Sequence, residues 1–258
     1  MKRFVLYNIL TLLGLLSLNA AKIESHKGEI ANGYDYLLAL PDDTVGQKPV
    51  VIFLHGASLC GRNLDRVKRY GTIDAIQKGR QIDAYVIAPQ NPGGAWKPNK
   101  ILDVLNTVSN NHNIDSNRVY VLGMSLGGYG TMDMAATYPD RIAAAVAICG
   151  GITVDSIINL RQVPLWIIHG TADRAVSVKQ SDRVVDQLKN HDSIQVRYIY
   201  DRLPGVNHSQ PARVLYMTEV YDWLFRHNLA EENRPAHETT PINNATLRNA
   251  YQGLHRTR

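Results

Sequence analysis

The sequence predicts an α/β protein built on a doubly wound, mainly parallel sheet. Apolar runs rich in Val, Ile and Tyr alternate with helix-like segments along the chain. Several of these runs are continuous, as in strands that are covered on both faces. Strands that alternate with helices form parallel sheets with right-handed crossovers, and ligands bind such sheets beyond the carboxyl ends of the strands.

In chain order, the expected strands are the apolar runs at residues 34–40, 50–54, 84–88, 119–122, 143–148, 165–168 and 196–200. The segments between them carry the helix-like patterns. We expect helices over residues 73–78, 101–110, 128–138, 178–190 and 213–227. The chain shows no internal repeat.

Composition is that of a globular protein with one substantial core. The 258 residues are 45% hydrophobic and 20% charged, which excludes disordered and fibrous classes. The formal net charge of +5 is not concentrated in a run of Lys and Arg interleaved with aromatic residues. We therefore expect no nucleic-acid partner.

Residues 1–20 have the pattern of a signal peptide. The basic start, Lys2 and Arg3, precedes an apolar stretch over residues 4–18, and small residues follow at Ala20 and Ala21. The alternative is an uncleaved membrane anchor. Cleavage predicts a secreted or periplasmic protein without stable membrane insertion, and it lowers the formal charge to +3 by removing two of 28 basic residues against 23 acidic ones.

The remainder of the chain divides into two parts. Residues 21–230 carry the strand and helix patterns and form the expected α/β domain. Residues 231–258 are polar, with Pro235, Pro241 and the pair Asn243 and Asn244, and they predict a poorly ordered tail with at most a short helix near residues 245–251.

A serine between two glycines lies between an expected strand and an expected helix. Gly123, Ser125 and Gly127 follow the run at 119–122 and precede the helix pattern. This arrangement is typical of a nucleophile elbow, a sharp turn that projects the serine hydroxyl and leaves no room for side chains at the two glycines. The alternative is a helix N-cap with glycines that only pack the strand against the helix.

A serine nucleophile needs a histidine base and an acid that orients it. Asp173 follows the strand at 165–168, and His208 follows the last expected strand, so both leave the same edge of the sheet as Ser125. Asp155 is the main alternative for the acid. Asp182 and Asp201 also compete, whereas His55 and His169 each precede a glycine at a strand end and fit a structural turn better.

The backbone N–H groups of Leu126 and Ala57 are the expected oxyanion hole, with Ser58 as the second choice for the latter. No group of His, Cys and carboxylates has metal-ligand spacing, so we expect no metal and no cofactor. Two cysteines, Cys60 and Cys149, favour free thiols over a disulfide, although their proximity at one sheet edge leaves the pair open.

These motifs resemble the α/β-hydrolases over roughly residues 48–228. Within that superfamily the chain is similar to the branch of dienelactone hydrolases, phospholipase/carboxylesterases, feruloyl-esterase-like proteins and predicted peptidases related to prolyl oligopeptidase. The motifs carrying the resemblance lie at residues 54–57, 88–90, 115–120, 123–130, 148–151, 169–173 and 206–208. The residues at 58–60 depart from the predicted-peptidase pattern, and residues 151–163 are too few for a lid domain.

The resemblance implies an exported serine hydrolase that cleaves a carboxylic ester through an acyl-enzyme, with feruloyl or acetyl esters on carbohydrate as expected substrates. The alternatives are a serine peptidase and a noncatalytic binding protein. Trp96 and Tyr129 are candidate substrate contacts, and each is equally compatible with the core. The sequence predicts neither the acyl group nor the oligomeric state.

Overall fold

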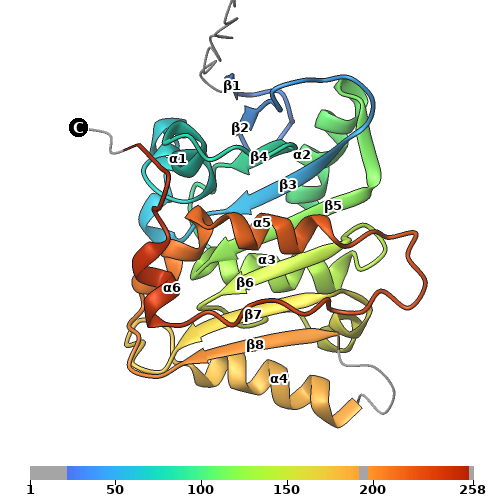
Figure 1. Ribbon diagram of the computed structural model, residues 1–258. Helices are drawn as coiled ribbons and strands as arrows, with labels where there is room; N and C mark the ends of the chain where they lie inside the picture. The colour runs from blue at the N-terminus through green and yellow to red at the C-terminus, as the bar shows by residue number, and fades with distance from the viewer. Residues whose placement is uncertain (1–21, 192–196, 256–258) are drawn as a thin grey trace, which may run out of the picture.

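The computed structural model describes residues 22–191 and 197–255 (Figure 1). The expected signal peptide at residues 1–20 lies outside the described residues. Within those ranges, every helix is too short or too polar to span a bilayer.

One eight-stranded sheet organises the protein, with strand order β1-β2-β4-β3-β5-β6-β7-β8. The strands from β4 to β8 along this order run parallel, and β1 and β2 pair antiparallel at one edge. This confirms the predicted doubly wound, mainly parallel sheet. The bounds are β1 Ile23–His26, β2 Tyr36–Ala39, β3 Lys48–Leu54, β4 Tyr85–Pro89, β5 Ile114–Met124, β6 Ala144–Ile148, β7 Leu165–Gly170 and β8 Tyr198–Leu203.

Helices cover both faces of this sheet (Figure 1). One buried cluster joins the sheet to α1, α5 and α6, and the other joins it to α2, α3 and α4. The central strands feed both clusters in alternation, with Val51 and Phe53 in the first and Ile52 in the second. The bounds are α1 Thr72–Gln77, α2 Pro98–Asn111, α3 Leu126–Thr137, α4 Lys179–His191, α5 Thr218–Phe225 and α6 Asn244–Asn249.

One strand and one helix depart clearly from the predicted elements. Strand β1 was not expected, because Glu24, Ser25 and His26 make it polar, and it is defined only by its pairing with β2. The helix expected over residues 213–227 is instead a 3-10 helix, η4 (Gln210–Tyr216), followed by α5. They meet at Met217, whose extended backbone (φ −88°, ψ 134°) interrupts the helix.

The C-terminal segment, residues 231–255, also differs from the prediction. It was expected to be a poorly ordered tail, but it crosses the sheet on the α5 side (Figure 1), and Ile242, Leu247 and Ala250 are buried in the core. The Ile242 N–H donates to the carboxylate of Asp201 on β8 at 3.0 Å. A few apolar side chains spaced along this polar segment are sufficient to attach it to the core. The average composition of the segment is polar and does not indicate these side chains.

Between β6 and β7 the chain forms only the 3-10 helix η3 (Ile157–Gln162). This agrees with the prediction that residues 151–163 do not form a lid domain. The carboxyl ends of β5, β7 and β8 lead directly into the segments that carry Ser125, Asp173 and His208.

Candidate active site

Ser125 is held in a strained backbone conformation between β5 and α3. Its φ of 59° and ψ of −119° fall in a region that L-residues rarely adopt, and such strain concentrates at functional sites. A Cβ at Gly127 would collide with the Leu54 carbonyl, and one at Gly123 would collide with Gly127 and Leu54. The turn therefore requires glycine at both positions, as the elbow pattern predicts.

The structure brings the three predicted residues together. His208 Nε2 lies 3.0 Å from Ser125 Oγ, and His208 Nδ1 lies 2.6 Å from Asp173 Oδ2. Nδ1 faces a carboxylate and therefore donates its proton, which leaves Nε2 free to accept the hydroxyl proton of the serine. The three groups thus form a hydrogen-bonded relay that leads from a buried carboxylate to a strained serine.

Asp173 is fully supplied with donors. The backbone N–H groups of Ala175 and Val176 donate to Oδ1 at 2.9 and 2.8 Å, and its side chain has no exposed surface. Burial alone would raise the pKa of Asp173, but the hydrogen bonds from Val176, His208 and Ala175 outweigh it, and the pKa falls below its ordinary value. The carboxylate therefore stays ionised beside His208.

The competing acids have other surroundings. Asp155 is exposed in the loop after β6. Asp182 pairs with Arg202 at 3.0 Å and accepts a hydrogen bond from Tyr200 at 2.7 Å. Asp201 accepts hydrogen bonds from Trp166 Nε1 at 2.9 Å and from the C-terminal segment. None of the three contacts His208 among the hydrogen bonds of the described residues.

The loop after β3 lies directly against the elbow, as the expected oxyanion hole requires. A Cβ built on Gly56 would lie 3.4 Å from Ser125 Cβ. Ala57 opens the 3-10 helix η1 (Ala57–Leu59), and Leu126 opens α3, where the first N–H groups have no acceptor within the helix. The roles of Ala57 and Leu126 as oxyanion donors remain predictions that this arrangement accommodates.

Tyr70 was not singled out in the sequence. Its hydroxyl accepts the Gly56 N–H at 2.9 Å and so holds the loop after β3 in place. Arg66 supports the same loop through the Ser58 carbonyl at 2.8 Å. Both residues lie in or beside the 3-10 helix η2 (Leu64–Lys68), whose sequence has no motif that would indicate this contact.

Trp96 belongs to the core and not to the cleft, which corrects its tentative assignment as a substrate contact. Only 2% of its surface is exposed, and its Nε1–H donates to the His55 carbonyl at 3.2 Å. Its ring packs against the rings of Tyr34 and His55 and lies next to Gly130 of α3. Tyr129 is half-buried beside the elbow, so its substrate role remains a prediction.

Cys149 lies behind the relay. Its Sγ, the Asp173 carboxylate and the His208 ring offer three ligand atoms within 4.8 Å of one another. The 2.6 Å separation between His208 Nδ1 and Asp173 Oδ2 is that of a hydrogen bond, and a metal ion bound there would displace its proton. The geometry therefore fits a hydrogen-bonded pair of carboxylate and imidazole better than a metal site. Cys60 and Cys149 are both free thiols.

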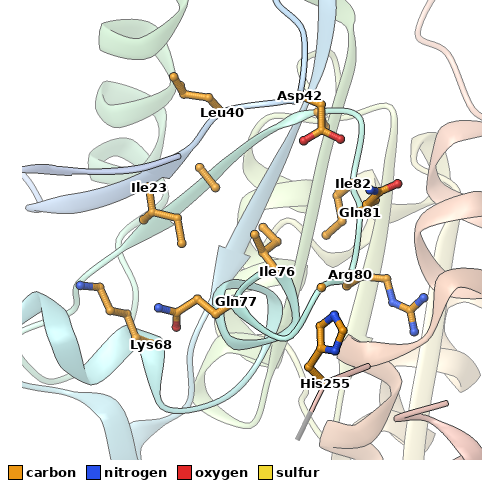
Figure 2. A pocket seen from close by; sticks show the side chains of 13 residues that line it. Ile23, Leu40, Asp42, Lys68, Ile76, Gln77, Arg80, Gln81, Ile82 and His255 are labelled. Atoms are coloured by element: carbon orange, nitrogen blue, oxygen red, sulfur yellow. The ribbon is translucent and has the colours of Figure 1, made fainter. Parts of the chain in front are cut away.

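A hollow of about 520 Å³ lies elsewhere, next to α1 and β2. Figure 2 shows Ile76, Arg80 and Ile82 around it, with His255 of the C-terminal segment at its rim. Its lining is mixed in polarity and does not include Ser125, Asp173 or His208.

The family model of the dienelactone hydrolase family matches residues 82–213, a range that contains Ser125, Asp173 and His208. The chain belongs to the dienelactone hydrolase family. This family is a family of hydrolases. Several of the curated proteins that are similar to this chain are esterases.

Acetylxylan esterase A of Emericella nidulans is 42% identical over 146 residues, covering 48% of this chain and 44% of that protein. Poly(3-hydroxyalkanoate) depolymerase C of Paucimonas lemoignei is 32% identical over 130 residues, covering 43% and 30%. Feruloyl esterase B of Neurospora crassa is 28% identical over 134 residues, covering 43% and 42%. The match thus spans less than half the length of each of these relatives.

Solved structures show the same fold. A thermostable esterase superposes with a TM-score of 0.65 and 24% identity, over 81% of this chain and 63% of that one. The acetyl xylan esterase of Aspergillus awamori superposes with a TM-score of 0.59 and 16% identity, over 74% and 95%. At these identities the likeness concerns the fold alone.

Proposed function

We propose that this protein is an exported serine hydrolase that cleaves carboxylic esters through an acyl-enzyme. The observation that carries the proposal is the hydrogen-bonded relay from Asp173 through His208 to Ser125 on a strained elbow. Its membership of a hydrolase family and its esterase relatives support the same reaction class.

In the first half-reaction, Ser125 Oγ attacks the ester carbonyl carbon while its proton passes to His208 Nε2. The carbonyl oxygen becomes an oxyanion, which the N–H groups of Leu126 and Ala57 stabilise. Asp173 holds the imidazolium that has formed. When the tetrahedral intermediate collapses, the bond to the alkoxy oxygen breaks and His208 returns the proton to the departing alcohol.

In the second half-reaction, water takes the place of the alcohol. His208 removes a proton from the water, the resulting hydroxide attacks the acyl carbon, and the serine leaves with the proton from His208. The products are the carboxylic acid and the free serine. Each proton that His208 accepts is returned within the same half-reaction, so the enzyme is regenerated.

We further propose acetyl or feruloyl esters on carbohydrate as the substrate class. Acetylxylan and feruloyl esterases are among the relatives, and the connection between β6 and β7 carries no lid domain that would restrict a bulky alcohol. The depolymerase relative supports a second class, the poly(3-hydroxyalkanoate) esters.

Labelling with a fluorophosphonate probe tests the nucleophile. We expect the label on Ser125 alone, and we expect Ser125→Ala to abolish both labelling and ester hydrolysis while the protein stays folded. Peptide mapping that places the label on another residue, or a Ser125→Ala variant of undiminished activity, would contradict the proposal. Ser116→Ala, at an exposed position near the start of β5, is the matched control and should still be labelled.

A panel of substrates tests the reaction class and the substrate class. We expect activity on nitrophenyl acetate and on acetylated or feruloylated xylan oligosaccharides. Release of anilide from peptide substrates only would favour the peptidase alternative, degradation of polyester films would favour the second ester class, and silence on every substrate would favour a binding protein. Mass measurement of the exported protein tests cleavage after residue 20.

A further inference from the structure

Behind the relay, a second buried histidine contacts the same carboxylate. His169 at the end of β7 has no exposed surface, and its Nε2 lies 3.3 Å from Asp173 Oδ2, the oxygen that also accepts from His208. The same Nε2 lies 3.0 Å from the Val176 carbonyl. The sequence suggested only a structural turn for this residue.

The partners of His169 determine where its proton lies. Nε2 faces two oxygens that can only accept, the Val176 carbonyl and the Asp173 carboxylate. On the other side, Nδ1 lies 2.8 Å from Ser181 Oγ, whose hydroxyl can donate either to Nδ1 or to the Gly150 carbonyl at 2.9 Å. The Ser181 hydroxyl is the only one of these partners that can either donate or accept a hydrogen bond. Nε2 therefore carries a proton whether the ring is neutral or charged.

Among the residues whose side chains the structure describes, the other two fully buried histidines, His55 and His227, have the opposite arrangement. Nε2 of His55 accepts the Asn91 N–H at 3.1 Å, and Nε2 of His227 accepts the His237 N–H at 3.3 Å. Their Nδ1 atoms lie 2.9 Å from the backbone carbonyls of Gly56 and Trp223. These partners satisfy a neutral ring. His169 differs from both because its Nε2, which is bonded to the Val176 carbonyl, also lies 3.3 Å from a carboxylate oxygen.

We propose that His169 is a positioning residue for the relay: its Nε2–H binds the Asp173 carboxylate as a second histidine donor and limits how strongly that carboxylate holds the His208 ring. The inference rests on the proposed function. With this donor present, Asp173 shares its negative charge between two rings. Without it, the carboxylate is more basic and the His208 imidazolium more stable.

Other titratable groups near the pair do not change charge in the same pH range. Burial raises the pKa of Cys149, behind Asp173, and that of Tyr129 on α3, so both stay neutral. Burial would raise the pKa of Asp182 on α4, but the hydrogen bonds from Arg202 and Tyr200 outweigh it and lower the pKa, so this group stays ionised. Burial lowers the pKa of His169 itself, despite the raising effect of Val176 and Asp173.

The experiment compares three substitutions at one position. His169→Leu removes the donor, His169→Asn keeps a polar group near Ser181 but is too short to reach Asp173, and His169→Gln places an N–H close to the original Nε2. For each, kcat and KM for nitrophenyl acetate are measured from pH 5 to pH 9. Circular dichroism establishes that the variants are folded, and His227→Leu, an equally buried histidine away from the relay, is the matched control.

We expect His169→Leu and His169→Asn to move the acid limb of kcat/KM to higher pH by about 0.5–1 unit, because the His208 imidazolium is then more stable. KM and the value of kcat on the alkaline plateau should change little, because a more basic carboxylate also stabilises the imidazolium that forms during the reaction. His169→Gln should keep the limb of the wild type. His227→Leu should lose stability without moving the limb.

An unmoved limb in the folded Leu or Asn variant would overturn the proposal, and so would a Gln variant that behaves as they do. If the Leu variant does not fold, the Asn and Gln pair decides. Failure of the proposed function has a different signature, since the wild-type enzyme would then not be labelled at Ser125 by the fluorophosphonate.

Discussion

Asp173 is the residue whose surroundings are most completely defined. It accepts two backbone N–H groups on one oxygen and the His208 ring on the other, and it is ionised because these three hydrogen bonds outweigh its burial. An acid in this setting acts by holding the imidazole in one tautomer and by stabilising its charged form.

We therefore expect Asp173→Asn to reduce kcat by on the order of 10⁴-fold, because an amide would favour the wrong tautomer of His208. Asp155→Asn is the matched control, since Asp155 is exposed and forms no hydrogen bond with His208 among the described residues. Steady-state kinetics on a nitrophenyl ester compares the two variants. A crippled Asp155→Asn with a competent Asp173→Asn would show that the acid is misassigned.

The sequence patterns predicted Ser125, Asp173 and His208 better than the residues that hold them in place. Ser125, Asp173 and His208 could be found because each follows a strand of a parallel sheet, and all such strand ends meet at one edge. Tyr70 and His169 could not, because their contacts depend on how loops fold over that edge. Trp96 was ambiguous because an aromatic residue in a loop suits a cleft and a core equally well.

At the scale of the element, the turn between β5 and α3 depends on backbone contact. We expect Gly127→Ala to abolish activity and to reduce the soluble yield, since its Cβ would collide with the Leu54 carbonyl, which a strand holds in place. Gly28→Ala is the control. It adds a Cβ at a φ of 67° with no atom within 4 Å, so it should cost only about 1 kcal/mol. An active, soluble Gly127→Ala would refute the clash.

The C-terminal segment provides a second prediction at this scale. Leu247 on α6 is 1% exposed in the cluster shared with α1 and α5, and we expect Leu247→Ala to lower the free energy of unfolding by about 2–4 kcal/mol. Val45→Ala, at a position 84% exposed, should change it by less than about 0.5 kcal/mol. Urea unfolding measures both, and equal midpoints would mean that the segment does not contribute to the core.

The elements themselves were largely predictable, and their failures have physical causes. Strands buried in the sheet are continuous apolar runs, and this pattern predicted the strands from residue 34 onward. Strand β1 was not predicted, because an edge strand is defined by its pairing with a neighbour and not by its own hydrophobicity. The packing of residues 231–255 on the core was not predicted, because the few buried residues of this segment are spread among polar ones.

At the scale of the whole molecule, buried histidines make stability depend on pH. Burial lowers the pKa of His55 and of His227 to about 4, with His237 adding to the effect at the latter. In the unfolded chain both rings titrate near ~6.5. Between these values the unfolded state binds more protons, so the stability present at neutral pH is lost as the pH falls below the unfolded value.

We expect the free energy of unfolding to decrease by roughly 2 kcal/mol for each of these histidines between pH 7 and pH 5. Urea unfolding at several pH values measures the decrease. His227→Gln should remove about half of the part due to the pair. If the variant lost stability with the same pH dependence as the wild type, His227 would not be the group that titrates.

The path of residues 231–255 bears on the order in which the chain can fold. Ile242 binds Asp201 on β8, whereas the His255 N–H donates to the Lys78 carbonyl at the end of α1, at 2.8 Å. Late-synthesised residues therefore cover elements made much earlier. A chain emerging from a ribosome must leave these apolar surfaces uncovered until residues 231–255 follow, so this face of the sheet can be closed only after that segment has been made.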